Sequence, residues 1–526
     1  MNAITQSFGP PPVPLIPETA PFTPEQRAWL NGFLAGIYGG AMGGAENMSV
    51  GGGPPGAAVE EEEDFPWHDP ALGLDERLAM AEGKPPARRY MAAMAQLDCG
   101  QCGYLCKTYA EAISSGAESS LGLCVPGGKA TQKALKALVA EAPAAAAPKP
   151  ALKKATGPEL APIRMLSAER LTKEGSAKDV RHIVLDLAES GLRYQPGDSL
   201  GLLCPNDPAL VEACVSALGA TGEELVPCPD GQSRPVREAF AAHISIARPL
   251  DRTLDLLAGS ARDKREATAL RALADGDDGA EPADADLLDL LHAFPSARPA
   301  LSDLAASLPG LKPRLYSIAS SPLAARGRVD LCVSVVRADR RGRKRDGVAS
   351  AHLGFRATSE VPLPAHMQES HFRLPEDPTV PVIMCGPGTG IAPFRAFLQH
   401  RAAQGLKGRT WLFFGDQRSA TDFLFADEIA GWREDGTLER LSLAWSRDQA
   451  KKVYVQDRMR EEAADLWRWF QEGGRFYICG DASRMAKDVD TALREIATKQ
   501  GGMNADAARD WIVALARQGR YQRDVY

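Results

Sequence analysis

Residues 381–401 read PVIMCGPGTGIAPFRAFLQHR, and this stretch decides the fold of the C-terminal part of the chain. It opens with an apolar run, Val382–Cys385, whose length is typical of a buried strand. A glycine-rich turn follows and precedes a predicted helix, Ala392–Arg401. Glycines at such a turn let the backbone approach a pyrophosphate, and the helix N-terminus supplies N–H donors. A plain tight turn is the alternative. The residues expected to contact a phosphate are Gly386, Gly388, Thr389 and Gly390.

Further apolar runs, Trp411–Phe414 and Phe476–Cys479, alternate with helical patterns. This alternation predicts a parallel, doubly wound, Rossmann-like sheet over residues 376–526. Ligands of such sheets lie outside the carboxyl ends of the strands, which would place Cys479 beside the reactive ring of a dinucleotide. A buried structural cysteine is the alternative interpretation.

A second cluster on this sheet is Ser446-Arg447 followed by residues 452–456, KVYVQ. A guanidinium, an ammonium and hydroxyl groups at the end of a strand could neutralise a phosphate dianion. On a nucleotide-binding sheet, that group would be the 2′-phosphate that distinguishes NADPH from NADH. A solvated charged loop is the alternative.

Upstream of residue 376, the composition and the apolar pattern of the chain change several times. Residues 1–80 are predicted to be partly flexible, apart from a helix start at Pro24, and a linker rich in alanine and proline spans 141–158. From residue 159 to 375, short alternating strands such as Arg181–Leu187 predict an antiparallel β-barrel, with a helical insertion at about 207–305.

The bulk composition limits the possible functions. A chain of 526 residues should divide into several domains, and its net charge of −7 argues against a nucleic-acid binder. The N-terminus lacks the basic start and apolar stretch of a signal peptide, and no run is apolar enough to span a membrane. We therefore expect a cytoplasmic protein whose ten cysteines are thiols or metal ligands rather than disulfides.

Six motifs share their order and spacing with a known family: RLYSIASSP, GVAS, the stretch at 381–401, LAWSRDQAKKVYVQD, YICGDASRMAKDVD and the terminal YQRDVY. They resemble the ferredoxin–NADP reductase-like half of the diflavin reductases, and within it the flavoprotein (alpha) subunits of NADPH-dependent assimilatory sulfite reductase. The resemblance covers residues 160–526 and implies an NADPH-dependent oxidoreductase with FAD.

The resemblance also assigns residues to three subsites. The hydride path between nicotinamide and flavin would be lined by Ser317, Cys479 and Asp524. The 2′-phosphate and adenine of NADPH would be bound by Ser446, Arg447, Lys452, Val453, Tyr454, Val455, Gln456 and Asp488. FAD would be bound by Arg314, Leu315, Tyr316, Ser317, Cys332, Val333, Ser334, Gly347, Val348, Ala349, Ser350 and the terminal aromatic Tyr526.

The N-terminal part departs from that family. Residues 1–155 lack the length and the phosphate loop of the flavodoxin-like FMN domain that normally precedes the barrel, so no FMN is expected. A predicted small helical domain at 81–140 instead carries four cysteines that suit a [4Fe–4S] cluster. Their pattern resembles the iron–sulfur domain of Rnf-type and corrinoid iron–sulfur proteins, although the third cysteine follows the second by one residue fewer. A structural zinc site is the alternative. The predicted ligands are Cys99, Cys102, Cys106 and Cys124.

These patterns lead to two hypotheses from different classes. In the first, electrons pass from NADPH through FAD and the cluster to a separate sulfite reductase haemoprotein, with assimilatory nitrate reductase as the alternative acceptor. FAD accepts two electrons at once, and a one-electron cluster would relay them singly. In the second, the cysteine domain is a zinc-stabilised docking module that carries no electrons. A homo-oligomer is possible in either case.

Overall fold

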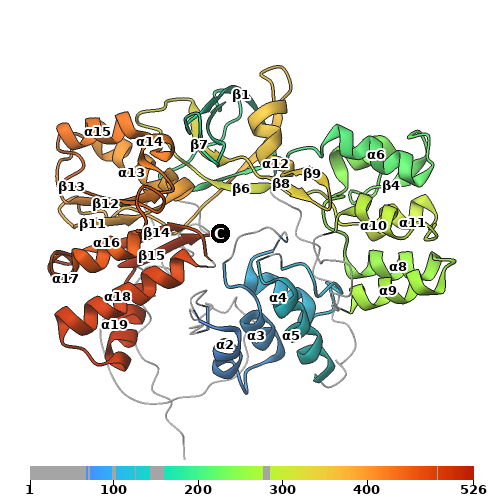
Figure 1. Ribbon diagram of the computed structural model, residues 1–526, viewed down its shortest axis with the longest axis horizontal. Coiled ribbons are helices and arrows are strands. Elements are labelled where there is room, and N and C mark those ends of the chain that lie inside the picture. Colours follow the sequence, from blue (N-terminus) through green and yellow to red (C-terminus); the bar gives the residue numbers. More distant parts are fainter. Residues whose placement is uncertain are drawn as a thin grey trace, which may run out of the picture. The chain divides into compact units, whose positions relative to one another are not determined.

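The computed structural model describes residues 67–68, 72–97, 102, 104–124, 126–141, 159–275, 285–482 and 484–526. The predicted helix start at Pro24, the linker after residue 141 and Cys99 lie outside the described residues. Residues from Phe65 to Tyr526 belong to one compact unit, and the colours of Figure 1 follow its elements in chain order. Within the described part, no helix is long and apolar enough to cross a membrane.

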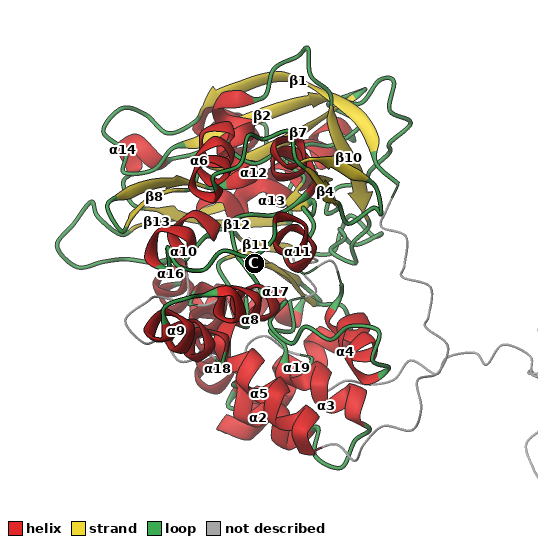
Figure 2. Cartoon of the chain, turned by 90° about the vertical axis from the view of Figure 1, so that its right-hand side faces the viewer, coloured by secondary structure: helices red, strands yellow, loops and turns green. Residues whose placement is uncertain are grey.

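The first described elements form a small all-helical module, which Figure 2 shows as helices and loops. Its core contains Tyr90, Tyr109 and Leu135, and Cys124 joins it. Trp67 is also buried and packs against Ala81 and Ala92, so the module extends upstream of residue 81. The helices are α2 (Leu74–Met80), α3 (Pro86–Ala93), α4 (Cys106–Ser114) and α5 (Gly128–Glu141).

A six-stranded antiparallel sheet follows, in the part of the chain where the sequence predicted an antiparallel β-barrel. The strand order is β6-β3-β10-β1-β2-β7, and an isolated bridge between Ile318 and Leu331 joins the two edge strands. Apolar side chains alternate inward to form its core. The strands are β1 (Ala161–Arg170), β2 (Val180–Asp186), β3 (Ser199–Leu202), β6 (Arg314–Ser317), β7 (Arg328–Ser334) and β10 (Leu363–Gln368); a hairpin, β8 (Arg337–Arg340) and β9 (Arg343–Asp346), and the helices α12 (Val348–Ala351) and η2 (His352–Arg356) precede β10.

The stretch between β3 and β6 is mainly helical and has its own apolar core, in which Phe240 and Leu270 are fully buried. A two-stranded ribbon accompanies the helices. The elements are α6 (Pro208–Leu218), β4 (Leu225–Pro227), β5 (Ser233–Pro235), α7 (Val236–Glu238), η1 (Ala239–His243), α8 (Asp251–Ser260), α9 (Lys264–Ala274), α10 (Leu287–Ala293) and α11 (Leu301–Ser307).

The C-terminal part is a five-stranded parallel sheet, which confirms the doubly wound prediction. Its strand order is β13-β12-β11-β14-β15. The elements are β11 (Val382–Cys385), η3 (Gly388–Ile391), α13 (Ala392–Ala403), β12 (Thr410–Asp416), α14 (Ser419–Asp422), α15 (Ala426–Glu434), β13 (Arg440–Trp445), α16 (Val455–Glu461), α17 (Ala463–Gln471), β14 (Arg475–Gly480), α18 (Met485–Gly501), α19 (Ala505–Arg517) and β15 (Tyr521–Val525). Figure 1 shows α13 and α15 on one face of the sheet and α16 to α19 on the other.

A buried ion pair ties the two sheets together. Arg395 of α13 donates to Asp330 Oδ2 of β7 at 2.9 Å and to the carbonyl oxygen of Ala319 at 2.7 Å. The side chain of Arg395 is 5% exposed and that of Asp330 is fully buried. Arg395 also donates to Glu428 at 3.0 Å, and His182 Nε2 lies 3.1 Å from Asp330 Oδ2. Because the charges are withdrawn from water here, loss of Arg395 would leave the buried Asp330 without its nearest cationic partner.

We therefore expect Arg395→Leu to lower the free energy of unfolding by about 3–5 kcal/mol. Arg468→Leu is the control, because Arg468 pairs with Asp465 at 2.9 Å on the surface, where such pairs contribute less than about 1 kcal/mol. Denaturant unfolding of both variants measures the difference. Equal losses in the two would contradict the structural role of the buried pair.

Candidate active site

Three predicted residues from distant segments meet where the two sheets face each other. Ser317 Oγ, at the end of β6, donates to Asp524 Oδ2 at 2.5 Å. Cys479 Sγ donates to the same oxygen at 3.5 Å. Cys479 and Asp524 are paired in register on β14 and β15, so the parallel sheet places thiol and carboxyl side by side. The antiparallel sheet supplies the hydroxyl.

Burial shifts the pKa values of the two titratable groups in this trio. It raises the pKa of the Asp524 carboxyl, although hydrogen bonds from Ser317 and Cys479 oppose the shift. Burial, followed by the neighbouring Asp524, raises the pKa of the Cys479 thiol well above its usual value. Since the thiolate is the nucleophilic form, Cys479 is a neutral donor here and not a covalent catalyst. The trio can orient a bound ring and respond to its charge.

The glycine turn after β11 packs directly on this site. A Cβ atom at Gly390 would lie 2.1 Å from the carbonyl oxygen of Cys479, so only glycine fits. Gly388 has a φ of +59°, a conformation that glycine adopts without strain. Gly386 opens the same turn. The predicted phosphate-binding turn and the predicted ring-binding site are therefore neighbours.

The last residue of the chain lies over the turn. The hydroxyls of Tyr526 and Thr389 are 3.0 Å apart, and the backbone N–H of Tyr526 donates to Gly480 at 3.0 Å. Tyr526 as a residue is nevertheless partly accessible, with a relative exposure of 49%. An accessible aromatic ring next to the trio is suited to stacking on a flat cofactor.

The predicted 2′-phosphate residues follow β13. The Ser446 and Arg447 N–H groups donate to the backbone of residues 416 and 417 at 3.0 and 2.8 Å, which fixes the loop. The Arg447 side chain points outward, as do those of Lys452 and Tyr454, while Val453 is half-buried. These exposed cationic and hydroxyl groups are accessible to a phosphate.

The structure also brings two more predicted nucleotide contacts together. Gln456, buried beside Val455 at the start of α16, donates through Nε2 to Asp488 Oδ2 at 3.2 Å. Its Oε1 atom is buried and has no hydrogen-bond partner among the described residues. Buried polar atoms are usually paired, so this oxygen fits a donor from a bound nucleotide.

A separate pocket adjoins Arg314, Val348 and Ala349, three of the predicted FAD contacts. The lining residues to which sequence reasoning assigned no role include Asn206, Arg248 and Lys312. Asn206 Oδ1 is buried without a hydrogen-bond partner among the described residues. An unpaired acceptor and three cationic side chains fit a cofactor that carries hydroxyls and a diphosphate, as FAD does.

The other predicted FAD contacts lie on strands β6 and β7 or at helix α12. Leu315 and Tyr316 of β6 pair with β3, next to Ser317. Cys332 and Val333 pair with His182 and Arg181 of β2, and Ser334 pairs with Val180. Gly347 opens α12, and the Ser350 hydroxyl accepts a hydrogen bond from the Val336 N–H at 3.1 Å.

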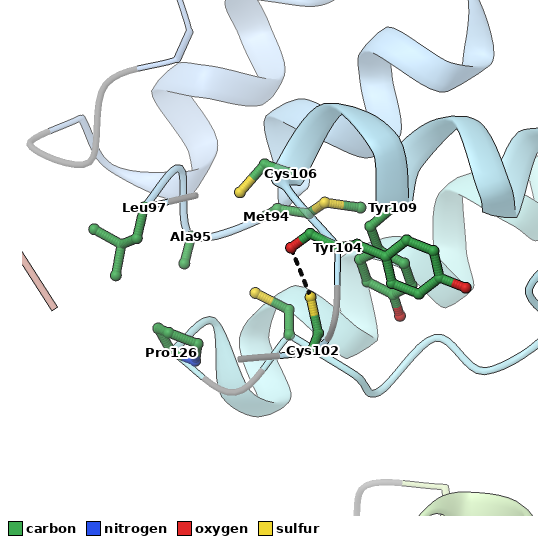
Figure 3. Close-up of a pocket in the computed structure, with 9 residues that line it drawn as sticks. Met94, Ala95, Leu97, Cys102, Tyr104, Cys106, Tyr109 and Pro126 are labelled. Carbon is green, nitrogen blue, oxygen red and sulfur yellow. Dashed lines mark hydrogen bonds between the residues drawn. The ribbon is translucent and has the colours of Figure 1, made fainter. Parts of the chain in front are cut away.

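The cysteines of the helical module line one apolar pocket. Cys102, Cys106 and Cys124 share its wall with aromatic and aliphatic side chains, drawn in Figure 3. Cys102 Sγ donates to the Tyr104 carbonyl oxygen at 3.4 Å, and the Tyr104 ring is stacked on Tyr109. The remaining lining residues are Met94, Ala95, Leu97 and Pro126.

The side chains of this pocket are chemically suited to a thiolate-bound metal group, but they are not arranged as a preformed metal site. No three cysteine, histidine or acidic side chains in the described part of the chain are gathered closely enough to hold a metal ion. Cys99, the fourth predicted ligand, is not among the described residues. Three thiols in one apolar pocket nevertheless provide the soft donors that iron–sulfur clusters use. Cys124 is buried, and Cys102 and Cys106 are half-buried.

The cysteine pocket and the FAD pocket share a wall. Cys102, Gly122 and Leu123 line the pocket that Arg314 also lines. The Lys312 ammonium donates to the Cys102 carbonyl oxygen at 2.5 Å and lies 5.4 Å from the centre of the Tyr104 ring. Lys312 therefore contacts the cysteine loop from the segment that leads into β6.

Comparisons with known proteins agree with this geometry. Residues 158–352 match the family described as FAD binding domain, and residues 384–491 match the family described as Oxidoreductase NAD-binding domain. The sulfite reductase [NADPH] flavoprotein alpha-component of Yersinia pestis bv. Antiqua (strain Antiqua) is 44% identical over 365 residues, or 68% of this chain and 59% of that protein. The protein of the same name from Serratia proteamaculans (strain 568) is 44% identical over 367 residues, with the same two shares. The chain thus spans about 59% of the length of these relatives.

Proposed function

Because the chain belongs to the diflavin reductase family of NADPH-dependent oxidoreductases, we propose that it passes electrons from NADPH through FAD to a [4Fe–4S] cluster and on to a separate acceptor protein. The proposed acceptor is a sulfite reductase haemoprotein, since the relatives carry that name, and the proposed compartment is the cytoplasm. Assimilatory nitrate reductase is the second acceptor to be tested.

The main support for this proposal is that the side chains of Ser317, Cys479 and Asp524 contact one another where the two sheets face each other. A nicotinamide entering over the glycine turn would reach the trio and lie under Tyr526. In this position the three side chains would hold the ring and exclude water, and Asp524 would respond to the positive charge that nicotinamide gains when it loses hydride. The hydride chemistry itself belongs to NADPH and FAD.

The proposed one-electron relay lies in the helical module. A [4Fe–4S] cluster stores and transfers single electrons, which a haem acceptor requires. Cys102, Cys106 and Cys124 would hold it together with Cys99, and the surrounding apolar side chains would keep water away. The wall shared with the pocket of Arg314 supports a short path between the two centres.

The direct test is iron, sulfide, zinc and flavin analysis of protein purified without oxygen. We expect about four iron and four sulfide atoms per chain, with one FAD and no FMN. The matched measurement is electron transfer to purified sulfite reductase haemoprotein and to nitrate reductase, with a dye as the control acceptor. One zinc per chain and no iron would overturn the relay and leave a one-flavin reductase whose cysteine module only docks.

A further inference from the structure

A loop of the FAD-binding domain, residues 171–179 between β1 and β2, is anchored on the nucleotide-binding sheet. The Lys173 N–H donates to the carbonyl oxygen of Thr421 at 2.9 Å. The Ser176 hydroxyl hydrogen-bonds to the Asp422 carboxylate. Lys178 Nζ donates to Asp416 Oδ1 at 2.5 Å. The backbone of this loop is thus held next to the end of β12.

The loop brings a cation to the glycine turn. A Cβ atom at Gly388 would lie 3.8 Å from Lys178 Nζ and 3.6 Å from Asp416 Oδ2. The Lys178 side chain is 35% exposed, whereas that of Asp416 is 1% exposed. Both members of the ion pair therefore adjoin the turn, but only the basic member is accessible from solvent.

Asp416 fixes the position of that ammonium. Its Oδ1 atom accepts both the Gln417 N–H, at 2.7 Å, and Lys178 Nζ. Its Oδ2 atom is buried without a hydrogen-bond partner among the described residues. The attraction between the ammonium and this buried carboxylate restrains an otherwise flexible lysine side chain.

The position of the turn defines which part of a dinucleotide passes there. The residues proposed for the adenosine end, Ser446 and Arg447, follow β13, and the residues proposed for the nicotinamide end, Cys479 and Asp524, lie on β14 and β15. The turn after β11 stands between these strands in the sheet order. The diphosphate that joins the two halves of NADPH must therefore cross the glycine turn.

We propose that Lys178, oriented by Asp416, is a further binding residue for the diphosphate of NADPH, supplied by the FAD-binding domain. An ammonium at this position adds a charge-assisted hydrogen bond to the N–H donors of the turn. Because the lysine and the turn belong to different domains, the bound diphosphate also links them across their junction. This inference rests on the use of NADPH proposed above.

The test compares two ligands that differ in the diphosphate. NADP⁺ contains it, whereas adenosine 2′-monophosphate keeps the 2′-phosphate and lacks the diphosphate. We expect Lys178→Met to weaken NADP⁺ binding about tenfold, the effect of one charge-assisted hydrogen bond, and to leave binding of adenosine 2′-monophosphate unchanged. Arg447→Ala is the matched control and is expected to weaken both ligands. Calorimetric titration of the FAD-loaded protein measures each affinity without turnover.

Two further variants distinguish a direct loss of NADP⁺ binding from a folding defect. Lys178→Met leaves Asp416 buried without its counter-charge, so the double variant Lys178→Met/Asp416→Asn removes both charges and is expected to show the same selective loss for NADP⁺. Lys178→Arg is expected to restore affinity to within about twofold, because the cation is retained. Equal NADP⁺ affinity in the double variant and the parent would overturn the role of Lys178. Failure of the parent itself to bind either ligand would instead overturn the use of NADPH.

Discussion

Replacement of Asp524 by asparagine is expected to slow reduction of the bound flavin by NADPH by about two to three orders of magnitude. Asp524 Oδ2 is the common acceptor for the Ser317 hydroxyl and the Cys479 thiol, so this one oxygen organises the trio. Asparagine preserves the size of the side chain but removes its negative charge. The variant would therefore lose the compensation of the charge that develops on nicotinamide, and its amide oxygen would accept the two hydrogen bonds more weakly than a carboxylate does.

Stopped-flow absorbance after mixing with excess NADPH measures this rate directly, with FAD content and NADP⁺ affinity recorded for the same samples. The matched control is Asp465→Asn. Asp465 lies on α17, and its Oδ2 atom accepts a hydrogen bond from Arg440 at 2.7 Å. This control is expected to leave the rate unchanged. An Asp524→Asn protein with full FAD, normal NADP⁺ affinity and an unchanged rate would remove Asp524 from the hydride site.

The pH profile provides a second readout. Burial raises the pKa of Asp524, so its ionisation is displaced upward from the ordinary carboxyl range. At pH values below this raised pKa, Asp524 is neutral and cannot compensate a positive ring. The parent rate is therefore expected to rise as the pH increases through that pKa. An asparagine side chain carries no charge at any pH, so the Asp524→Asn variant should lack this rise.

The residues nearest to each motif could be predicted from the sequence. The predicted strand Val382–Cys385 has the same bounds as β11, and the predicted helix Ala392–Arg401 differs from α13 by two residues at its end. These local predictions succeed because an apolar run and a glycine turn depend on a few adjacent residues. The trio could be assembled only through the family resemblance, since Ser317 and Asp524 are separated by 207 residues.

Charged pairs between domains escaped prediction. Lys178 and Asp416 are 238 residues apart, and Arg395 and Asp330 are 65 residues apart. Arg395 lies within the stretch 381–401, but no local pattern assigns it a partner, and the other three charges lie outside the recognised binding clusters. Their pairing follows from how one sheet packs against the other, which no local pattern encodes. The same holds for the FAD pocket, because Asn206 and Arg248 join Arg314 only in the folded chain.

Replacement of Cys106 by serine separates flavin chemistry from electron delivery. Cys106 is the first residue of α4 and lines the pocket that contains Cys102 and Cys124. Serine is a poor ligand for iron in a sulfur-bound cluster, so we expect loss of iron and sulfide from the purified protein. Reduction of a dye by NADPH should persist, because FAD and the trio of Ser317, Cys479 and Asp524 are untouched. Electron transfer to the haemoprotein should fall at least about a hundredfold, since single electrons would lack their relay.

The matched control is Cys228→Ala, because Cys228 is also buried but belongs to the separate core of the helical insertion. It is expected to retain iron, dye reduction and electron delivery. Three outcomes of Cys106→Ser lead to different conclusions. Loss of iron with loss of delivery supports the relay. Loss of zinc with loss of haemoprotein binding identifies a docking module, because zinc has no redox role. Full delivery by a protein without bound metal would contradict both, and would require electrons to leave directly from the flavin.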